Sequence, residues 1–476
     1  MPQPVKPRYA IVGVGGRAYL YLEALSRAHA GAGELVALCD SNPGRLARAA
    51  GYVADAGVQV ATYRADLFAQ MLADAAVDRV IVTSPDYTHA RYITAALEAG
   101  RDVVTEKPLT VDADSCRRIA AARTRSGRAL RVTFNYRYSP PRTLVKQALM
   151  SGIIGRVRAV NFEWQLDTHH GADYFRRWHR NKANSGGLFV HKATHHFDLL
   201  NWWLGSTVTR VRATGERGFY RPETADALGL APRGERCTGC PAFDRCRVRL
   251  DLSRSRALTG LYADNEGHDG YYRDRCVFSP DIDIEDTMAA ALTYENGAVV
   301  NYLLTANNPR EGYRAVFHGE RGLITLETTE RSYVREDGGL VRPALPETSS
   351  VVVQPLFSPP FDLAIPAAVG DHGGGDAVML QHLFGEIADD PYERAADELA
   401  GVWAAMVGIG ANASIAAGGE AVELSDLAGD IPRPSPRAPP FGAIHPWTQF
   451  NAGDYPFLAG AAREDAGSAW LRRHGV

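Results

Sequence analysis

A Gly-rich turn directly after a short apolar run is the feature that most constrains the fold of this chain. Residues 9–12 predict a buried parallel strand, and residues 18–29 have the composition of a helix. Gly13 permits a tight turn, Gly15 lets the backbone approach a pyrophosphate, and Ala18 allows the helix to pack closely. Because free N–H groups at a helix N-terminus favour negative charge, this segment predicts a phosphate-binding turn.

A second apolar run, residues 34–39, supports this interpretation because it ends in Asp40. A carboxylate at the end of this strand accepts hydrogen bonds from an adenosine ribose and repels a ribose 2′-phosphate. We therefore expect NAD as the cofactor rather than NADP. Arg45 is the residue that would reverse this preference, since a nearby arginine can accommodate the 2′-phosphate.

Length and composition indicate a two-domain enzyme. The chain has 476 residues, more than the roughly 250–300 at which a single core stops growing. A net charge of −3 with 22% charged residues provides no basic face for nucleic acid or an anionic membrane. The N-terminus lacks a signal-peptide pattern, and we see no apolar run approaching the roughly 18 residues of a membrane span. We expect a cytoplasmic protein with no nucleic-acid or membrane partner.

The order of strand and helix patterns divides the chain into an α/β domain, an α+β domain and an arm. Over residues 1–134, strand-like runs at 80–83, 102–105 and 130–134 alternate with helical stretches at 90–99 and 112–126. This predicts a doubly wound parallel sheet with its ligand at the carboxyl ends of the strands.

Residues 135–425 show a different pattern. Alternating segments at 157–166, 287–294, 298–305 and 313–318 predict a large, open, mainly antiparallel sheet. Residues 377–388 and 392–417 are expected to be helical. The remainder, 426–476, includes a Pro-rich run and is expected to form an extended C-terminal arm.

Four segments occur in the order and spacing of one enzyme family. They are GVGGR at 13–17, TEKPLTVD at 105–112, NYRYSP at 135–140 and GGLFVHKATHHFDLLNWWLG at 186–205. On these segments the chain resembles the Gfo/Idh/MocA oxidoreductases, named for glucose-fructose oxidoreductase, inositol dehydrogenase and rhizopine catabolism. The resemblance implies a Rossmann domain followed by an open-faced α/β domain. It also implies NAD(P)-dependent oxidation or reduction of a sugar, sugar derivative or cyclitol, and we expect a homo-oligomer, a dimer or tetramer.

Three residues are the candidates for catalysis. Oxidising a secondary alcohol needs a group that takes the hydroxyl proton and a group that stabilises charge on the oxygen. Lys107 resembles the family's catalytic lysine, and it would polarise the oxygen or act as a base if burial lowers its pKa. His195 resembles the family's histidine and can exchange protons near neutral pH.

His191 stands where the family usually has an aspartate, so a carboxylate expected near the reactive carbon is missing. His191 would bind a substrate hydroxyl or carry the proton itself. Helical spacing also allows His191, His195 and Asp198 to share one face.

Further residues are expected to line the cleft. Residues 83–86 follow a predicted strand and would border the cofactor. We expect cofactor binding by Gly13, Gly15, Gly16, Arg17, Asp40, Ser84, Pro85, Glu106, Lys107 and Asn135. Substrate contacts are expected from Arg137, His169, His170, Trp178, Lys182, His191 and His195. His191 and His195 also have the spacing of a helical zinc pair, but no Glu completes an H-E-x-x-H motif, so we favour a substrate pocket.

Four cysteines form a separate pattern, C-x2-C-x5-C-x29-C, inside a polar insertion at about 215–285. They are Cys237, Cys240, Cys246 and Cys276. In a reducing cytosol such thiols indicate a metal site rather than disulfides, and a thiolate set suits a structural zinc ion or an iron–sulfur cluster. Cys39 and Cys116 are expected to be small core residues.

Three functions remain open at this point. The first is an NAD-dependent dehydrogenase of a carbohydrate or cyclitol hydroxyl. The second is a glycoside-cleaving enzyme that uses tightly held NAD⁺ for transient oxidation and elimination, without net NADH. The third is a non-catalytic dinucleotide-binding regulatory protein, against which Lys107 and His195 argue.

Overall fold

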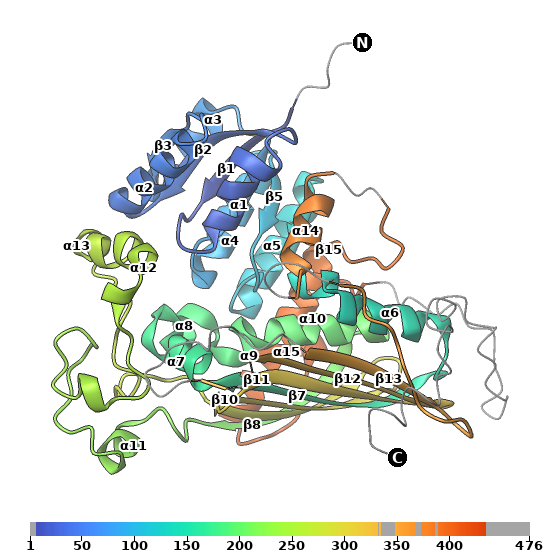
Figure 1. The fold of residues 1–476 in the computed structure, drawn as a ribbon. Helices are drawn as coiled ribbons and strands as arrows, with labels where there is room; N and C mark the ends of the chain where they lie inside the picture. Colours follow the sequence, from blue (N-terminus) through green and yellow to red (C-terminus); the bar gives the residue numbers. More distant parts are fainter. Residues whose placement is uncertain (1–5, 332, 335–347, 368–372, 386–388, 435–476) are drawn as a thin grey trace, which may run out of the picture.

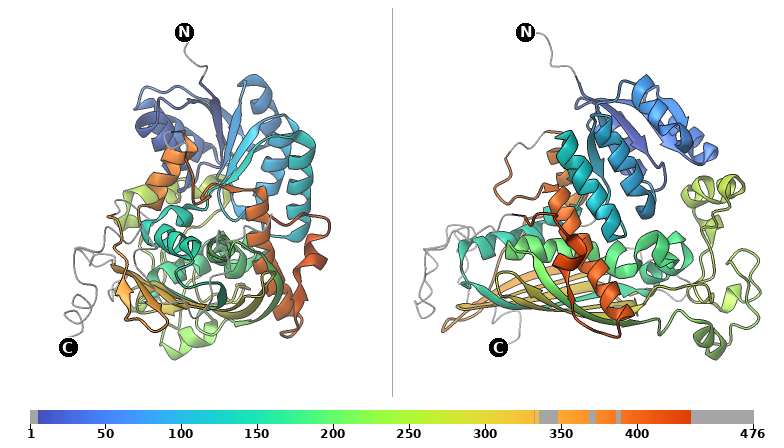
Figure 2. Two further views of the ribbon diagram at one scale, coloured as in Figure 1. Left: turned by 90° about the vertical axis from the view of Figure 1, so that its right-hand side faces the viewer. Right: turned by 180° about the vertical axis from the view of Figure 1, so that it is seen from behind.

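The computed structural model describes residues 6–331, 333–334, 348–367, 373–385 and 389–434. Two sheets organise these residues, a parallel one from the N-terminal part of the chain and a larger one below it (Figure 1). Helices lie on the face of the larger sheet that is turned toward the parallel sheet, and Figure 2 shows the same layers from two further sides.

The parallel sheet has the strand order β15-β6-β5-β4-β1-β2-β3 within the described residues. Its parallel strands are β1 Arg8–Val12, β2 Glu34–Asp40, β3 Ala61–Arg64, β4 Arg79–Val82, β5 Asp102–Thr105 and β6 Leu130–Val132. The helices between them are α1 Ala18–Glu23, α2 Pro43–Ala54, α3 Phe68–Asp74, α4 His89–Glu98 and α5 Ala113–Ser126. The inner strands are buried on both faces, as covered parallel sheets require. The expected doubly wound sheet is confirmed.

Two expected helices differ from the structure. The helix expected at 18–29 is α-helical only to Glu23 and then continues as a π-helix, Ala24–Ala28. The expectation that 392–417 is helical throughout was wrong at its start. Ala396–Asp397 forms β15, which pairs antiparallel with β6, and α15 begins afterwards as Glu398–Ala416. Asp397 sets this boundary because its side chain accepts a hydrogen bond from the Ala400 N–H at 3.0 Å.

The larger sheet has the order β14-β13-β12-β11-β7-β10-β9-β8-β16. Its strands are β7 Val157–Asp167, β8 Val208–Glu216, β9 Thr287–Tyr294, β10 Val299–Asn308, β11 Glu311–Gly319, β12 Gly322–Arg331, β13 Thr348–Pro355, β14 Phe361–Asp362 and β16 Val422–Glu423. Only β7 and β10 pair in parallel among these strands, so the expected mainly antiparallel sheet is confirmed.

Helices cover this sheet and fill the space beneath the parallel sheet. They are α6 Pro140–Ser151, α7 Thr168–Arg176, α8 Lys182–Ser185, α9 Gly187–His191, α10 Ala193–Leu204, α14 Gly375–Leu383, α15 and α16 Leu424–Ala428. By length and composition alone α15 would pass as a membrane span, which corrects our expectation that no apolar run approaches that size. The protein itself buries 61% of the most apolar window of α15, as expected of a core helix. The expected arm at 426–476 lies outside the described residues from 435 onward.

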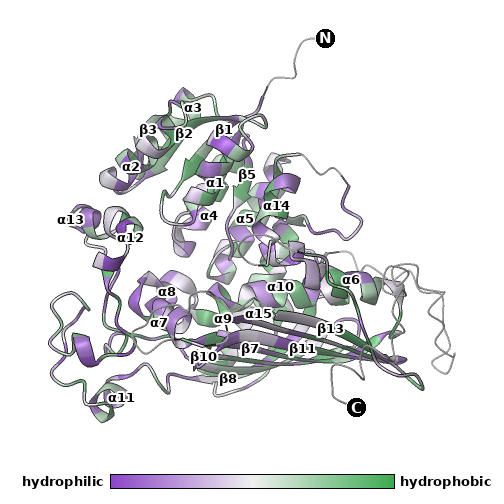
Figure 3. Ribbon diagram, viewed as in Figure 1, coloured by the Kyte–Doolittle hydropathy of each residue, from purple (hydrophilic) through white to green (hydrophobic). Residues whose placement is uncertain are grey.

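The polar insertion leaves the larger sheet after β8 and returns at β9. It contains α11 Pro222–Ala227, α12 Arg256–Leu261 and α13 Glu266–Asp269, and α12 and α13 rise beside α2 (Figure 1). In Figure 3, α13 is coloured hydrophilic, whereas β1 and β2 are largely hydrophobic. The Asn42 side chain donates to the Asn265 carbonyl at 3.0 Å, and a Cβ at Gly44 would lie 1.7 Å from Asn265 Oδ1. The tip of the insertion therefore packs directly on the first domain.

Candidate functional site

A cavity of about 590 Å³ opens at the carboxyl ends of the parallel strands. Its size lies within the roughly 300–1,000 Å³ of ligand sites. The second domain and the tip of the insertion complete its walls. Of the residues expected in the site, the cavity brings together Gly13, Gly15, Gly16, Arg17, Asp40, Ser84, Pro85, Glu106, Lys107, Asn135, His170, Trp178, His191 and His195.

The Gly-rich turn owes its shape to Gly13. This residue has φ +86°, and a Cβ there would lie 2.4 Å from Ser84 Cα, so both conformation and space require glycine. Gly15 and Gly16 face the cavity and leave the backbone accessible. The Gly16 N–H donates to the hydroxyl of Tyr262, an insertion residue, at 3.2 Å.

Asp40 is fixed by the backbone around it. Its two carboxylate oxygens accept hydrogen bonds from the N–H groups of Val14 at 2.7 Å and Asn42 at 2.8 Å. Arg45 lies between two carboxylates, 3.4 Å from Asp40 Oδ1 and 2.5 Å from Asp269 Oδ2 of the insertion. The arginine that could have accepted a 2′-phosphate is thus already paired.

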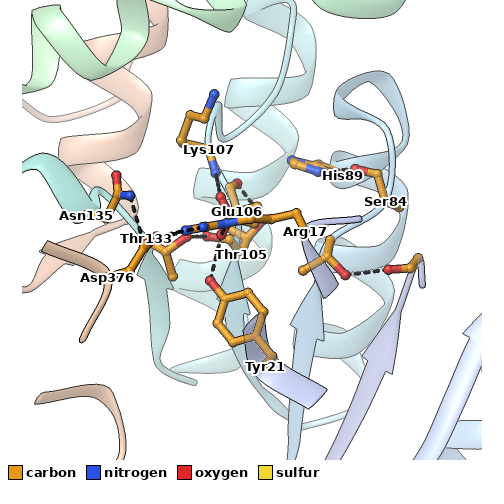
Figure 4. A network of polar contacts seen from close by, with 12 residues as sticks. Arg17, Tyr21, Ser84, His89, Thr105, Glu106, Lys107, Thr133, Asn135 and Asp376 are labelled. Atoms are coloured by element: carbon orange, nitrogen blue, oxygen red, sulfur yellow. Dashed lines mark hydrogen bonds and ion pairs between the residues drawn. The ribbon is translucent and has the colours of Figure 1, made fainter. Parts of the chain in front are cut away.

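A network of charged side chains joins the turn to the start of the EKP segment (Figure 4). Arg17 Nε lies 2.6 Å from Glu106, and its Nη2 lies 2.9 Å from Asp376. Tyr21 donates to Glu106 at 2.7 Å, and Asn135 donates to Asp376 at 2.8 Å. Burial alone would raise the pKa of Glu106, but the Arg17 charge and these hydrogen bonds outweigh it and hold that pKa below its usual value. Glu106 therefore stays ionised and anchors the segment that carries Lys107.

Lys107 points away from this network toward the second domain (Figure 4). Its Nζ donates to the backbone carbonyl of His191 at 3.2 Å. Burial lowers the pKa of Lys107 to about 8, although the nearby Asp86 carboxyl opposes the shift. An amine with this pKa can change its protonation state close to neutral pH.

Asp86 and His191 form the closest polar pair in this part of the cavity wall. Asp86 Oδ2 lies 2.5 Å from His191 Nδ1; Asp86 is buried, and the side chain of His191 is 11% exposed. Burial raises the pKa of Asp86, which Lys107 and Arg177 counteract, and burial with the charge of Lys107 lowers the pKa of His191 well below its ordinary value. His191 is therefore neutral at physiological pH. The carboxylate that the sequence lacks at position 191 is supplied by the first domain.

His195 lies beside an aromatic group that reaches the larger sheet. Its ring stacks on Tyr136 at 4.1 Å between centroids. The buried Lys192 donates to the Tyr136 hydroxyl at 2.9 Å and lies 4.7 Å from the Trp164 ring centroid. Lys192 lines the cavity and was missed by the sequence reasoning, although it directly follows His191.

Other residues that line the cavity were missed by the sequence reasoning. Tyr136, Tyr174, Arg177, His179, Tyr262, Asp269 and Tyr271 all reach the cavity. Arg177 and His179 flank Trp178, so the local run of basic and aromatic residues could have indicated them. For the insertion residues no local signal exists, since their position depends on the fold of the whole insertion.

Three expected substrate residues are not among those that line the cavity. Arg137 is buried and binds Asp198 with two hydrogen bonds, of 2.8 and 2.5 Å. Lys182 pairs with Glu285. His169 lies in the first turn of α7, where its N–H donates to Asp167.

The four cysteines of the insertion line a second, smaller cavity of about 30 Å³. All six cysteines are free, and Cys39 and Cys116 are buried as expected. In the part of the chain that the structure describes, no group of three or more His, Cys, Asp or Glu side chains is arranged so that it could hold a metal ion.

Comparison with known proteins agrees with this architecture. Two models of the GFO_IDH_MocA family match the chain. The one described as "Oxidoreductase family, NAD-binding Rossmann fold" matches residues 7–134, and the one described as "Oxidoreductase family, C-terminal alpha/beta domain" matches residues 146–424. YteT of Bacillus subtilis, a candidate oxidoreductase, is 34% identical over 421 residues, which is 85% of this chain and 95% of that protein.

Two further proteins illustrate the range of similarity. An inositol 2-dehydrogenase of Saccharopolyspora erythraea is 36% identical over 215 residues, 45% of this chain and 59% of that protein. The WlbA dehydrogenase of Bordetella pertussis, solved with NADH and UDP-GlcNAcA, has a TM-score of 0.57 at 20% identity, covering 88% of this chain and 98% of that one. At this identity the structural likeness shows the fold alone.

Proposed function

Because the chain belongs to the Gfo/Idh/MocA oxidoreductase family, we propose that it is an NAD-dependent dehydrogenase of a secondary hydroxyl or ketone on a sugar, sugar derivative or cyclitol. The observation that carries this proposal is the meeting of the Gly-rich turn with Lys107, His191 and His195 in one cavity. The name of the inositol 2-dehydrogenase relative supports the substrate class. We assign the NAD-binding domain to residues 1–134, the substrate-binding domain to residues 135–425 and the C-terminal arm to residues 426–476.

The residues present fit a nicotinamide dinucleotide. When bound, this cofactor supplies the acceptor or donor of the hydride. The turn at 13–17 would hold the pyrophosphate on backbone N–H groups, and Asp40 would face the ribose. Asn135 Oδ1 is a buried acceptor without a hydrogen-bond partner among the described residues, and it lines the same cavity. An amide group of the cofactor would satisfy it.

The pairing of Arg45 supports NAD over NADP. A 2′-phosphate next to Arg45 would also meet the carboxylates of Asp40 and Asp269, and both already neutralise the guanidinium. Asp269→Asn removes one of them and should tighten NADP⁺ binding about tenfold while leaving NAD⁺ affinity within about twofold. Fluorescence titration of the apo protein measures both. An unchanged NADP⁺ affinity would show that Asp269 plays no part in the preference.

In this proposal Lys107 and His191 have different roles at the substrate oxygen. The ammonium form of Lys107 stabilises negative charge as it develops on that oxygen. His191 is neutral, and Asp86 Oδ2 lies beside its Nδ1. When Asp86 is ionised it accepts the proton of Nδ1, and Nε2 is then able to accept the hydroxyl proton. Asp86 acts through His191 and is a positioning residue.

His195 is the second candidate for the proton acceptor. It lines the cavity, and its stacking on Tyr136 fixes the plane of its ring. His191 is favoured because Asp86 Oδ2 lies 2.5 Å from its Nδ1 and can hold the proton of the ring on that side. The two assignments separate by mutation when turnover is measured well below the pKa of Lys107, because Lys107 then keeps its proton and Asp86→Asn acts through His191.

The proposal is tested by incubating the purified protein with NAD⁺ and a panel of sugars, cyclitols and glycosides. Absorbance of NADH and the organic product are followed together. Stoichiometric NADH and ketone from one member of the panel is the expected result. Cleavage of a glycoside without net NADH would replace the dehydrogenase by the elimination mechanism. Tight NAD⁺ binding with no turnover of any member would favour a regulatory protein.

A further inference from the structure

At the base of the insertion, its four cysteines line one small cavity. Cys237, Cys240 and Cys246 lie close in sequence, and Cys276 returns to them from the far end of the insertion. The Cys237 N–H donates to the Asp274 carbonyl and the Cys276 N–H to the Glu235 carbonyl, each at 2.8 Å. These two hydrogen bonds hold the outgoing and returning strands of chain side by side.

Every one of the four sulfurs receives a backbone N–H. Leu250 donates to Cys237 Sγ and Gly234 to Cys240 Sγ, each at 3.3 Å. The backbone N–H groups of Val248 and Phe278 serve Cys246 and Cys276 in the same way. A neutral thiol is a weak acceptor, whereas thiolates bound to a metal centre regularly take such hydrogen bonds.

Positive charge surrounds the same small cavity. Its lining includes the four arginines Arg176, Arg233, Arg236 and Arg249. Arg176 is buried, and its Nη1 lies 3.9 Å from Cys237 Sγ. Arg233 pairs with Asp226, and Arg236 pairs with Glu266 and Asp274. Four thiolates around a metal centre carry net negative charge, which Arg176 and the other nearby cations would help to balance.

The geometry distinguishes a single ion from a larger centre. A zinc ion at about 2.3 Å from each sulfur needs all four sulfurs around one point. No group in the described residues is arranged to hold one ion in this way. The thiols instead surround a space of about 30 Å³, which exceeds the roughly 10–15 Å³ that one water needs. In a four-iron cluster each cysteine binds a different iron, so the sulfurs stand further apart than around one zinc ion.

We propose that Cys237, Cys240, Cys246 and Cys276 hold an iron–sulfur cluster of the four-iron class, which fastens the base of the insertion. The insertion carries Tyr262 and Asp269 to the large cavity, so the cluster supports one wall of that cavity from a distance. It takes no part in the reaction at Lys107 and His191. This inference does not depend on the proposed substrate.

Metal and sulfide analysis of the full-length protein, purified without oxygen from iron-sufficient cells, is the direct experiment. We expect about four irons and four acid-labile sulfides per chain, with broad absorbance near 400 nm. Stoichiometric zinc without iron would overturn the proposal. If the protein is isolated without metal, anaerobic incubation with equal amounts of ferrous and ferric iron and with sulfide should restore the cluster. Folded protein that keeps four titratable thiols after this treatment would equally overturn it.

Variants assign the ligands. Cys246→Ser should lose the iron and the absorbance, whereas the matched control Cys116→Ala, which alters a buried cysteine outside the cluster, should keep both. Limited proteolysis of Cys246→Ser should then cut within residues 247–275 faster than in the control. Full iron content in Cys246→Ser would remove that residue from the ligand set and contradict the assignment. If this variant fails to fold, the analysis of the unaltered protein decides the question.

Discussion

Asp86→Asn is the substitution that isolates the role of the carboxylate supplied across the two domains. In the structure Asp86 Oδ2 lies 2.5 Å from His191 Nδ1. An asparagine amide there donates to Nδ1, which moves the ring proton to Nε2 and removes the acceptor. General-base catalysis and the loss of a histidine-orienting aspartate lead us to expect a fall in kcat/KM of about 10²–10⁴. This equals about 3–5 kcal/mol of activation free energy.

The same substitution should not destabilise the protein. Burial raises the pKa of Asp86 above its value in the unfolded chain, so the folded state binds the proton more tightly than the unfolded state. Wild-type stability therefore declines as pH rises above about 4, where the unfolded carboxyl ionises. The uncharged asparagine lacks this decline, and its melting temperature at pH 7 should equal or exceed that of the wild type.

Steady-state kinetics, NAD⁺ titration and thermal melts of the same samples give the answer. NAD⁺ affinity should stay within about threefold of the wild type, a change of under 1 kcal/mol. The double variant Asp86→Asn with His191→Ala should be no slower than His191→Ala alone, because both changes remove one unit. Near-normal kcat/KM in Asp86→Asn, or fully additive losses in the double variant, would refute the reasoning.

Four further variants have expected outcomes. Lys107→Ala should lower turnover by about 10² or more with NAD⁺ binding retained. Because burial lowers the pKa of Lys107 to about 8, kcat/KM of the wild type should fall as pH rises through that value and the ammonium loses its proton. His195→Ala should also cost about 10² in turnover if His195 exchanges the proton. His191→Asp introduces the usual family residue and should keep measurable activity with an altered pH–rate profile. An unchanged profile would make His191 a spacer. Arg137→Ala should cost about 3–5 kcal/mol of unfolding free energy in denaturant melts, because it leaves the buried Asp198 unpaired; a raised KM at normal stability would return Arg137 to the substrate site.

The parts of the site that the sequence could predict are those built by local motifs. Gly13, Asp40 and Lys107 each follow a strand of the parallel sheet, and the carboxyl ends of parallel strands meet at one edge. Their convergence therefore follows once the strands are recognised. The bounds of β1, β2, β4 and β5 were predictable to within a residue for the same reason, since buried parallel strands are short apolar runs. The mostly exposed β3 was missed, and β6 ends two residues earlier than expected.

The remainder depends on contacts between distant segments. The sequence shows that a carboxylate is missing at His191, but that Asp86 replaces it becomes visible only when the two domains are packed together. Arg137 was misassigned because its partner, Asp198, lies 61 residues further along the chain. The charge of an arginine also gives no indication that the side chain is buried. The short strand β15 was missed because two residues carry no periodicity, and its pairing with β6 is long-range.

Direct hydrogen transfer is the measurement that tests the central claim most closely. The substrate identified from the panel is prepared with deuterium on the carbon that bears the hydroxyl group, and the reaction is run in ordinary water. The account predicts about one deuterium in each NADH formed, and loss of this transfer in Lys107→Ala. A cleaved product whose neighbouring C–H has exchanged with solvent, without labelled NADH accumulating, would contradict it.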